Sequence, residues 1–304
     1  MSERFVRNNA ANPMNPIPLP KQVPAKRALA KLPGRKIFYA DTGGAGEAVI
    51  FLHAAATGDP KVWAYQQPVF AKAGYRVICY ARRGYYKSDK VRKGDKHSAA
   101  DDLKGLLDAL SIEKAHIVSS AAGGSIAADF ALSYPKRTLS LAITSNYAGI
   151  RKGNILKMAE SCRVKQWNEM PRWYREFSCS YIAANPKGLR AWNKLADDAT
   201  KHQGVQQAHN NFITPQVLSK MKVPTLLVTG DADSSTPPSI MRMVAKCIRR
   251  SELVTVAECG HSIYWEHPKI FNDIVLDFIR QHRKAQALGG EPFLGVRQIG
   301  ASSV

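Results

Sequence analysis

The feature that most constrains the fold is an alternation of short apolar runs with longer amphipathic stretches. The apolar runs occupy residues 36–44, 48–56, 75–84, 115–124, 139–148, 224–233 and 253–261. Helical spacing follows at residues 98–110, 125–135, 238–250 and 268–285. Alternating strands and helices are typical of βαβ units, in which helices cover parallel strands. We therefore predict an α/β fold with a mostly parallel, doubly wound sheet.

One stretch interrupts this alternation between the fifth and sixth predicted strands. Residues 148–216 have a helical pattern and are rich in Trp and Tyr. An insertion there would cover the C-terminal edge of the sheet, where open α/β folds bind ligands. We predict a helical cap over 148–216, inserted into a core of residues 35–147 and 217–285. An N-terminal arm over 1–34 and a C-terminal tail over 286–304 complete the chain.

The arm is basic, contains several prolines and lacks the apolar region of a secretory signal. The chain carries 44 Lys and Arg against 24 Asp and Glu, a formal net charge of +20. Such a surface favours anionic partners, but no nucleic-acid-binding motif accompanies it, so we expect no nucleic-acid partner. No run approaches the roughly 18–20 apolar residues of a membrane span. We expect a cytoplasmic protein, and a homo-oligomer stays open.

Motifs for bound groups are missing from the sequence. It contains no phosphate-binding loop, no dinucleotide-binding glycine motif and no Cys or His spacing typical of a metal site. We therefore expect no cofactor, no metal and reduced thiols at the five scattered cysteines, which are Cys79, Cys162, Cys179, Cys247 and Cys259.

Five motifs stand at strand ends in a fixed order. They read LHAAATG (52–58), ARRGYYKSD (81–89), SSAAGG (119–124), GDADSSTPP (230–238) and CGHSIYWEHP (259–268). In this order the chain resembles the α/β-hydrolase superfamily, apart from the cap. Members carry a His-Gly-x element, an Arg-Gly element, a nucleophile elbow, a Gly-x-x-Asp turn and a Gly-His pair. The resemblance implies the α/β-hydrolase fold and Ser-His-Asp acyl transfer.

The elbow departs from the family pattern G-x-S-x-G at its central position. The first glycine aligns with Ser119, the serine with Ala121 and the second glycine with Gly123. The family's nucleophile lies on a sharp strand-to-helix turn that exposes its side chain, and the flanking residues must be small. Ala121 therefore occupies the position of the nucleophile without its hydroxyl group.

Three explanations compete for this alanine. The nucleophile has moved to Ser119, Ser120 or Ser125, although neighbours on a strand point to opposite sides. Alternatively, the chain is a natural pseudoenzyme. That explanation conflicts with the retained elbow, because a non-glycine residue at positive φ costs free energy. We favour the third explanation, in which Ala121 replaces serine in an inactivated enzyme that binds substrate but hardly turns it over.

The remaining catalytic residues follow in the order that the resemblance implies. His261 ends the last predicted strand as the base, and Asp233 would orient its imidazole. Asp231 is the rival acid, but the Gly-x-x-Asp spacing from Gly230 selects Asp233.

Backbone N–H groups would stabilise the oxyanion of a tetrahedral intermediate. The resemblance implies Ala122 and Ala55 as the oxyanion-hole donors, with Ala54 as the fallback and His53 shaping the loop. We expect Arg83 to make a structural ion pair. Further substrate contacts are expected from Ala54, Arg82, Trp167, Trp173 and Tyr264.

A carboxylic ester or lactone is the substrate class that this chemistry favours, and Arg82 suits a substrate with a carboxylate. Cleavage of carbon–carbon bonds in vinylogous diketones from aromatic-ring degradation is the alternative on the same fold. Dehalogenation and epoxide opening, which use Asp at the elbow, stay open. A ligand receptor on the hydrolase scaffold is the alternative without catalysis.

Overall fold

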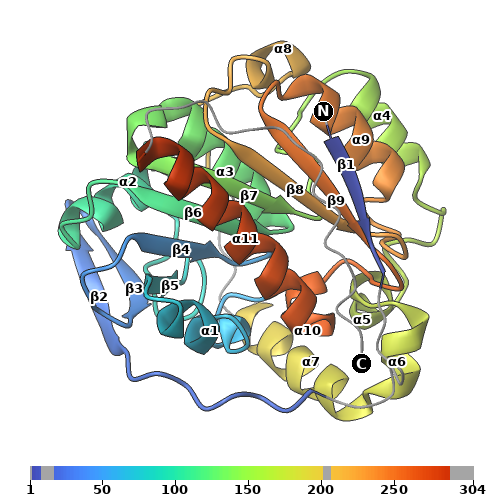
Figure 1. The fold of residues 1–304 in the computed structure, drawn as a ribbon, viewed down its shortest axis with the longest axis horizontal. Helices are drawn as coiled ribbons and strands as arrows, with labels where there is room; N and C mark the ends of the chain where they lie inside the picture. Colours follow the sequence, from blue (N-terminus) through green and yellow to red (C-terminus); the bar gives the residue numbers. More distant parts are fainter. Residues whose placement is uncertain (1, 8–16, 201–206, 288–304) are drawn as a thin grey trace.

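The strands of this chain form one sheet. The computed structural model describes residues 2–7, 17–200 and 207–287. Its 9-stranded sheet has the order β1-β9-β8-β7-β6-β4-β5-β3-β2 (Figure 1). The strands are β1 Ser2–Val6, β2 Lys26–Leu32, β3 Arg35–Asp41, β4 Ala48–Leu52, β5 Arg76–Tyr80, β6 Ala115–Ser120, β7 Thr138–Thr144, β8 Thr225–Gly230 and β9 Ser251–Val256. Pairing is parallel from β1 to β5 along this order, and β3 is antiparallel to both β5 and β2.

Helices cover both faces of the sheet, which confirms the predicted fold class. The main helices are α1 Gln67–Lys72, α2 Ala99–Ala109, α3 Ala122–Ser133, α9 Pro238–Cys247 and α11 Pro268–Ala287. Helices α2, α3 and α9 pack on one face, and α1 and α11 pack on the other (Figure 1). None of the helices in the described ranges has the length and apolar character needed to cross a bilayer.

Side-chain alternation along the central strands explains this double packing. Every residue of β4 is buried, as expected for a parallel strand covered on both faces. Ile50 packs with α2 and α3, whereas Val49 and Phe51 pack with α1 and α11. Successive side chains of a strand point to opposite faces, so one apolar run contributes to both clusters.

The N-terminal segment corrects the predicted arm. Ser2–Val6 pairs in parallel with β9, and Lys26–Leu32 pairs with β3 through a turn at Gly34, whose φ is 74°. The exposed positions of β2 are Lys26, Arg27, Leu29 and Lys31, and only Ala30 and Leu32 are buried. This charged edge strand lacks the apolar run by which strands are recognised. Residues 8–16 of the predicted arm lie outside the described residues.

Short helices lie between β7 and β8, where the sequence predicts a cap over 148–216; residues 201–206 of that range lie outside the described residues. They are α4 Asn154–Ser161, α5 Arg172–Glu176, α6 Cys179–Ala184, α7 Pro186–Thr200 and α8 Pro215–Leu218. Helices α5, α6 and α7 gather at one end of the sheet, beside α10 Ile263–Glu266 (Figure 1, lower right). Helix α4 instead packs against α9. The predicted tail, from residue 288 onward, lies outside the described residues.

A buried ion-pair network holds the first strands to α2. Asp102 accepts hydrogen bonds from Arg35 Nε at 2.5 Å and from Arg83 Nε at 2.6 Å. All three side chains are buried, and Arg83 also contacts Asp95. The structural ion pair expected for Arg83 is confirmed.

Replacing the shared acid tests this network. Asp102→Ala leaves two buried guanidinium groups without their common partner, so we expect a loss of about 3–5 kcal/mol of unfolding free energy. Asp108→Ala is the control, because Asp108 lies on the same helix with an exposed side chain, and loss of its ion pairs with Lys104 and Arg137 should cost about 0–1 kcal/mol each. Urea denaturation measures both losses. Equal losses would contradict the assignment.

Candidate active site

The turn between β6 and α3 has the geometry of a nucleophile elbow. Ala121 lies between the strand and the helix with φ 46° and ψ −123°. Its N–H donates to the carbonyl of Thr144 at 2.9 Å, which ties the turn to β7. A non-glycine residue at positive φ is strained, so the surrounding packing must impose this conformation.

The packing around the turn shows why its neighbours are small. A Cβ at Gly123 would lie 2.6 Å from the carbonyl oxygen of Leu52 and 2.9 Å from that of His53. A Cβ at Gly124 would lie 2.7 Å from Cβ of Asn146. The first turn of α3 therefore rests directly on the ends of β4 and β7. Only glycine allows this approach.

The three serines nearest Ala121 differ in the contacts of their hydroxyl groups. Ser119 Oγ donates to the carbonyl of Ala142 at 2.9 Å, and Ser125 Oγ contacts Asn146 Oδ1 at 3.4 Å. The Ser120 hydroxyl is buried without a hydrogen-bond partner within the described part of the chain. None of the three hydroxyls is bonded to His261.

His261 and Asp233 form the expected pair. His261 Nδ1 lies 2.9 Å from Asp233 Oδ2, and both side chains are buried. Burial of the imidazole disfavours its charged form, but the charge and hydrogen bond of Asp233, aided by Glu176, raise the pKa of His261 to about 9. Nδ1 is engaged by the carboxylate, so Nε2 is the nitrogen left to exchange a proton with a substrate.

Backbone donors hold the acid in place. The N–H groups of Ser235 and Thr236 both donate to Asp233 Oδ1 at 2.8 Å. Burial alone would raise the pKa of Asp233, but His261 and these two amides lower it below its usual value. The rival acid Asp231 is exposed. The geometry therefore selects the same carboxylate as the Gly-x-x-Asp spacing.

The loop after β4 is organised by His53. This buried imidazole contacts the carbonyl of Ala54 through Nδ1 at 2.7 Å and accepts the N–H of Arg82 at Nε2. Burial, with the nearby Arg82 charge, lowers its pKa well below the usual value, so His53 is a neutral structural residue. Ala55 is exposed and Ala54 is buried, as are Ala121 and His261, and the substrate contact predicted for Ala54 stays a prediction.

The other expected oxyanion donor lies at the start of α3. Ala122 is the first residue of this helix, and the first N–H groups of a helix have no acceptor within it. Because Ala122 directly follows Ala121, its N–H suits an oxyanion that forms beside the turn.

Among the expected substrate contacts, Arg82, Trp167 and Trp173 are half-buried, whereas Tyr264 is fully buried. Arg82 Nη2 donates to the carbonyl of Ala54 at 3.2 Å, so its guanidinium lies beside the loop that carries Ala55. Tyr264 is 1% exposed and packs on Trp63, so the substrate contact predicted for it is corrected to a core position.

Three aromatic side chains of the cap pack on one another. Phe177 stacks on Tyr181 with ring centroids 4.8 Å apart and meets the edge of Trp192 at 5.2 Å. All three are buried. These aromatic pairs join α5–α7 to the core cluster beneath α11.

Two residues beside His261 were not singled out from the sequence. Glu176, at the end of α5, accepts a hydrogen bond from Ser262 Oγ at 2.7 Å. Its charge raises the pKa of His261, whereas Arg163 acts in the opposite direction. Ser262 directly follows the candidate base, which is the one signal in the sequence that points to it. Nothing in the sequence marks Glu176.

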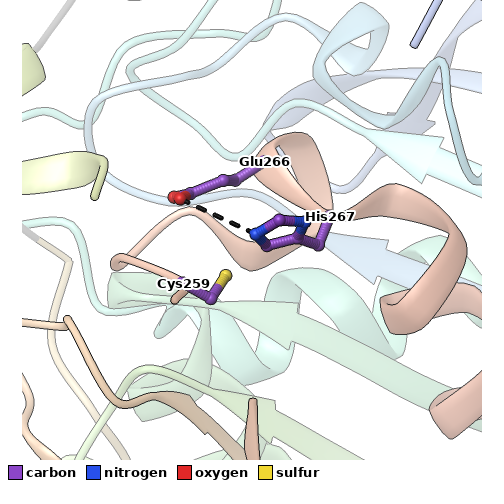
Figure 2. Close-up of side chains that lie close together, drawn as sticks. All are labelled: Cys259, Glu266 and His267. Atoms are coloured by element: carbon purple, nitrogen blue, oxygen red, sulfur yellow. Dashed lines mark ion pairs between the residues drawn. The ribbon is translucent and has the colours of Figure 1, made fainter. Parts of the chain in front are cut away.

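A second titratable cluster lies behind the histidine loop. Figure 2 shows Glu266 and His267 side by side, with Cys259 next to them. Their potential metal-ligand atoms lie within 4.8 Å of one another. Both oxygens of Glu266, however, already accept hydrogen bonds, from Ser178 and Gly260. We therefore assign this carboxylate to the connection between cap and loop rather than to metal binding.

Known proteins resemble this chain over most of its length. A family model described as the alpha/beta hydrolase family matches residues 49–274. A 2-hydroxy-6-oxononadienedioate/2-hydroxy-6-oxononatrienedioate hydrolase of Paraburkholderia xenovorans (strain LB400) is 31% identical over 270 residues, covering 80% of this chain and 90% of that protein. A 2-hydroxy-6-oxo-6-phenylhexa-2,4-dienoate hydrolase of Comamonas testosteroni is 27% identical, covering 81% and 92%.

Solved structures show the same fold. Est816, described as an N-acyl homoserine lactone degrading enzyme, is 26% identical with a TM-score of 0.65. The match covers 83% of this chain and 100% of that structure. An esterase from Thermogutta terrifontis has a TM-score of 0.67 at 22% identity, covering 85% and 99%.

A methyl group at Gly123 tests the close approach at the elbow. We expect Gly123→Ala to destabilise the fold by about 1–3 kcal/mol, because the new Cβ meets rigid backbone oxygens. Gly105→Ala is the matched control, since its Cβ would meet only the flexible end of Leu32, and alanine favours the helix. Thermal denaturation compares the two variants. A Gly123→Ala protein as stable as the control would show that the turn is not tightly packed.

Proposed function

The chain belongs to the α/β hydrolase family, and on this premise we propose that it is a carbon–carbon bond hydrolase whose nucleophilic serine is replaced by Ala121. The proposed substrates are hydroxy-oxo-dienoates, the class named for its relatives of 27% and 31% identity. The observation that carries the chemistry is the strained turn at Ala121, which is retained together with the His261–Asp233 pair.

The proposed reaction requires a serine at position 121. His261 would take the proton of the serine hydroxyl as Oγ attacks the ketone carbon of the substrate. The N–H groups of Ala122 and Ala55 would hold the oxyanion. The adjacent carbon–carbon bond would then break, and the leaving carbon, conjugated to the remaining carbonyl, would take the proton from the imidazolium. Water would release the acid from the acyl-enzyme by the same steps.

The chain with alanine should bind its substrate and leave it intact. Removal of such a serine lowers turnover by about 10⁶-fold, and the rest of the site stays in place. A methyl group also takes less space than the hydroxymethyl group of serine. Substrate would therefore sit at the turn without reacting.

Ester or lactone hydrolysis, which the sequence alone favours, is the second candidate. It is supported by the 26% identity to Est816, a protein described as degrading N-acyl homoserine lactones. The same serine, base and oxyanion donors would serve both reactions, because each begins with attack on a carbonyl carbon. We rank carbon–carbon cleavage above ester or lactone hydrolysis because the relatives of 31% and 27% identity are named as hydrolases of hydroxy-oxo-dienoates.

Restoring the hydroxyl tests the proposal. We expect Ala121→Ser to hydrolyse a 2-hydroxy-6-oxo-dienoate, followed by loss of its conjugated absorbance, at least about 10³-fold faster than the unaltered chain. The same protein is assayed on p-nitrophenyl esters and lactones. Ala121→Ser combined with His261→Gln is the control and should be inactive. Lack of turnover and of any acyl-enzyme by intact mass, on every substrate, would instead support a receptor or pseudoenzyme.

The pH dependence of the restored enzyme follows from the raised pKa of His261. A general base must be neutral, so kcat/KM should rise with pH through the pKa of the imidazole, with its midpoint above 6.5 and toward about 9. Asp233→Asn removes the charge that favours imidazolium. It should move the midpoint to lower pH and reduce kcat by about 10⁴-fold. A midpoint that does not move would contradict the pairing.

A further inference from the structure

The loop that carries His261 is hydrogen-bonded to the cap directly on one side of the histidine and through Glu266 of α10 on the other. On one side, Ser262 N–H donates to the carbonyl of Glu176 at 2.9 Å, and Ser262 Oγ donates to its carboxylate at 2.7 Å. On the other side, Gly260 N–H donates to Glu266 at 3.0 Å. Glu266 also accepts the N–H and the Oγ–H of Ser178.

The backbones of the loop and the cap are in direct contact. A Cβ at Gly260 would lie 2.6 Å from the carbonyl carbon of Phe177 and 2.6 Å from the nitrogen of Ser178. Phe177, Ser178 and Glu266 are all buried. The segment 176–178 therefore fills the space against the histidine loop, and neither can shift without the other.

Charged side chains of both the core and the cap affect the pKa of His261. Asp233 lies on the loop after β8, Glu176 ends α5, and Arg163 lies between α4 and α5. Asp233 is bonded to Nδ1, whereas Glu176 is bonded to Ser262, the residue that follows His261, and acts on the imidazole by its charge. The cap thus supplies a second carboxylate to a histidine that already has its triad acid.

We propose that residues 176–178 of the cap, together with Glu266 of α10, are a positioning element for His261, in which Glu176 holds Ser262 and Glu266 links Gly260 to Ser178. The inference rests on the proposed function only in naming His261 as the base. Glu176 acts through Ser262 and by its charge. Glu266 acts through Gly260 and Ser178. Neither carboxylate takes part in bond making or breaking.

Burial affects the second carboxylate as well. It raises the pKa of Glu266 to about 7, although Ser178 and Gly260 donate to it, and the charge of Asp233 adds to the rise. His267 Nε2 lies 3.9 Å away (Figure 2). A buried carboxylate that accepts hydrogen bonds from both segments fits a structural link between them.

The first test measures the pKa of His261 by NMR in the chain with Ala121. Glu176→Gln keeps an acceptor for Ser262 Oγ but removes the charge. We expect it to lower the pKa of His261 by about 0.5–1 unit. Glu169→Gln, at an exposed cap residue, removes the same charge and should leave that pKa unchanged. Equal shifts in the two variants would overturn the role of Glu176.

The second test measures amide hydrogen exchange in the loop. We expect Ser178→Ala and Glu266→Gln to speed exchange at Gly260 about tenfold, because each loosens the link to the cap. Ser180→Ala, at an exposed position of the same helix, is the control. If Glu266→Gln does not fold, the exchange rate of Gly260 in Ser178→Ala alone tests the role of Glu266. Unchanged exchange at Gly260 in Ser178→Ala would overturn the role of Glu266.

Neither measurement needs turnover. If Ala121→Ser hydrolyses nothing, the proposed function fails, but the two tests still decide whether the cap positions His261. If the enzyme is active and Glu176→Gln leaves the pKa of His261 unchanged, the further inference fails by itself.

Discussion

The close approach of α3 to the ends of β4 and β7 is the constraint on which the site depends. Gly123 and Gly124 leave no room for a side chain, so the chain must turn sharply between Ser120 and Ala122. The turn holds Ala121 at a φ of 46°, which is strained for alanine. Strain of this kind persists only where the surrounding structure imposes it. The elbow is therefore maintained by its packing and not by the residue at its tip.

The second half of the site depends on how one loop is held. His261 receives Asp233 from the loop after β8 and Glu176 from the cap, so its pKa of about 9 reflects two separate parts of the chain. Burial alone would lower that pKa, but the two carboxylates raise it by more than burial lowers it. A histidine in this setting is a stronger base than a free imidazole, at the cost of being protonated near neutral pH.

Much of the fold could be predicted because its physical causes are local. Strands such as 48–52 and 225–230 are buried throughout because parallel strands are covered on both faces, so their sequences are mostly apolar. The site motifs stand at strand ends, and the carboxyl ends of parallel strands meet at one edge of the sheet. The strand at Lys26–Leu32 was missed because its charged outer positions hide the pattern. Tyr264 was misplaced because motif position carries no information on burial.

The sequence by itself determined the α/β class through its local alternation of apolar runs and helical stretches. Its resemblance to the α/β-hydrolase superfamily placed Ala121 in the elbow motif and favoured Asp233 over Asp231. Only the tertiary structure decided that Glu176 and Ser178 lie against the histidine loop and that Ala54 is buried beside Ala55. The physical reason is separation along the chain. Glu176 and Ser262 are 86 residues apart, and no local pattern records a contact that arises when the cap folds back on the sheet.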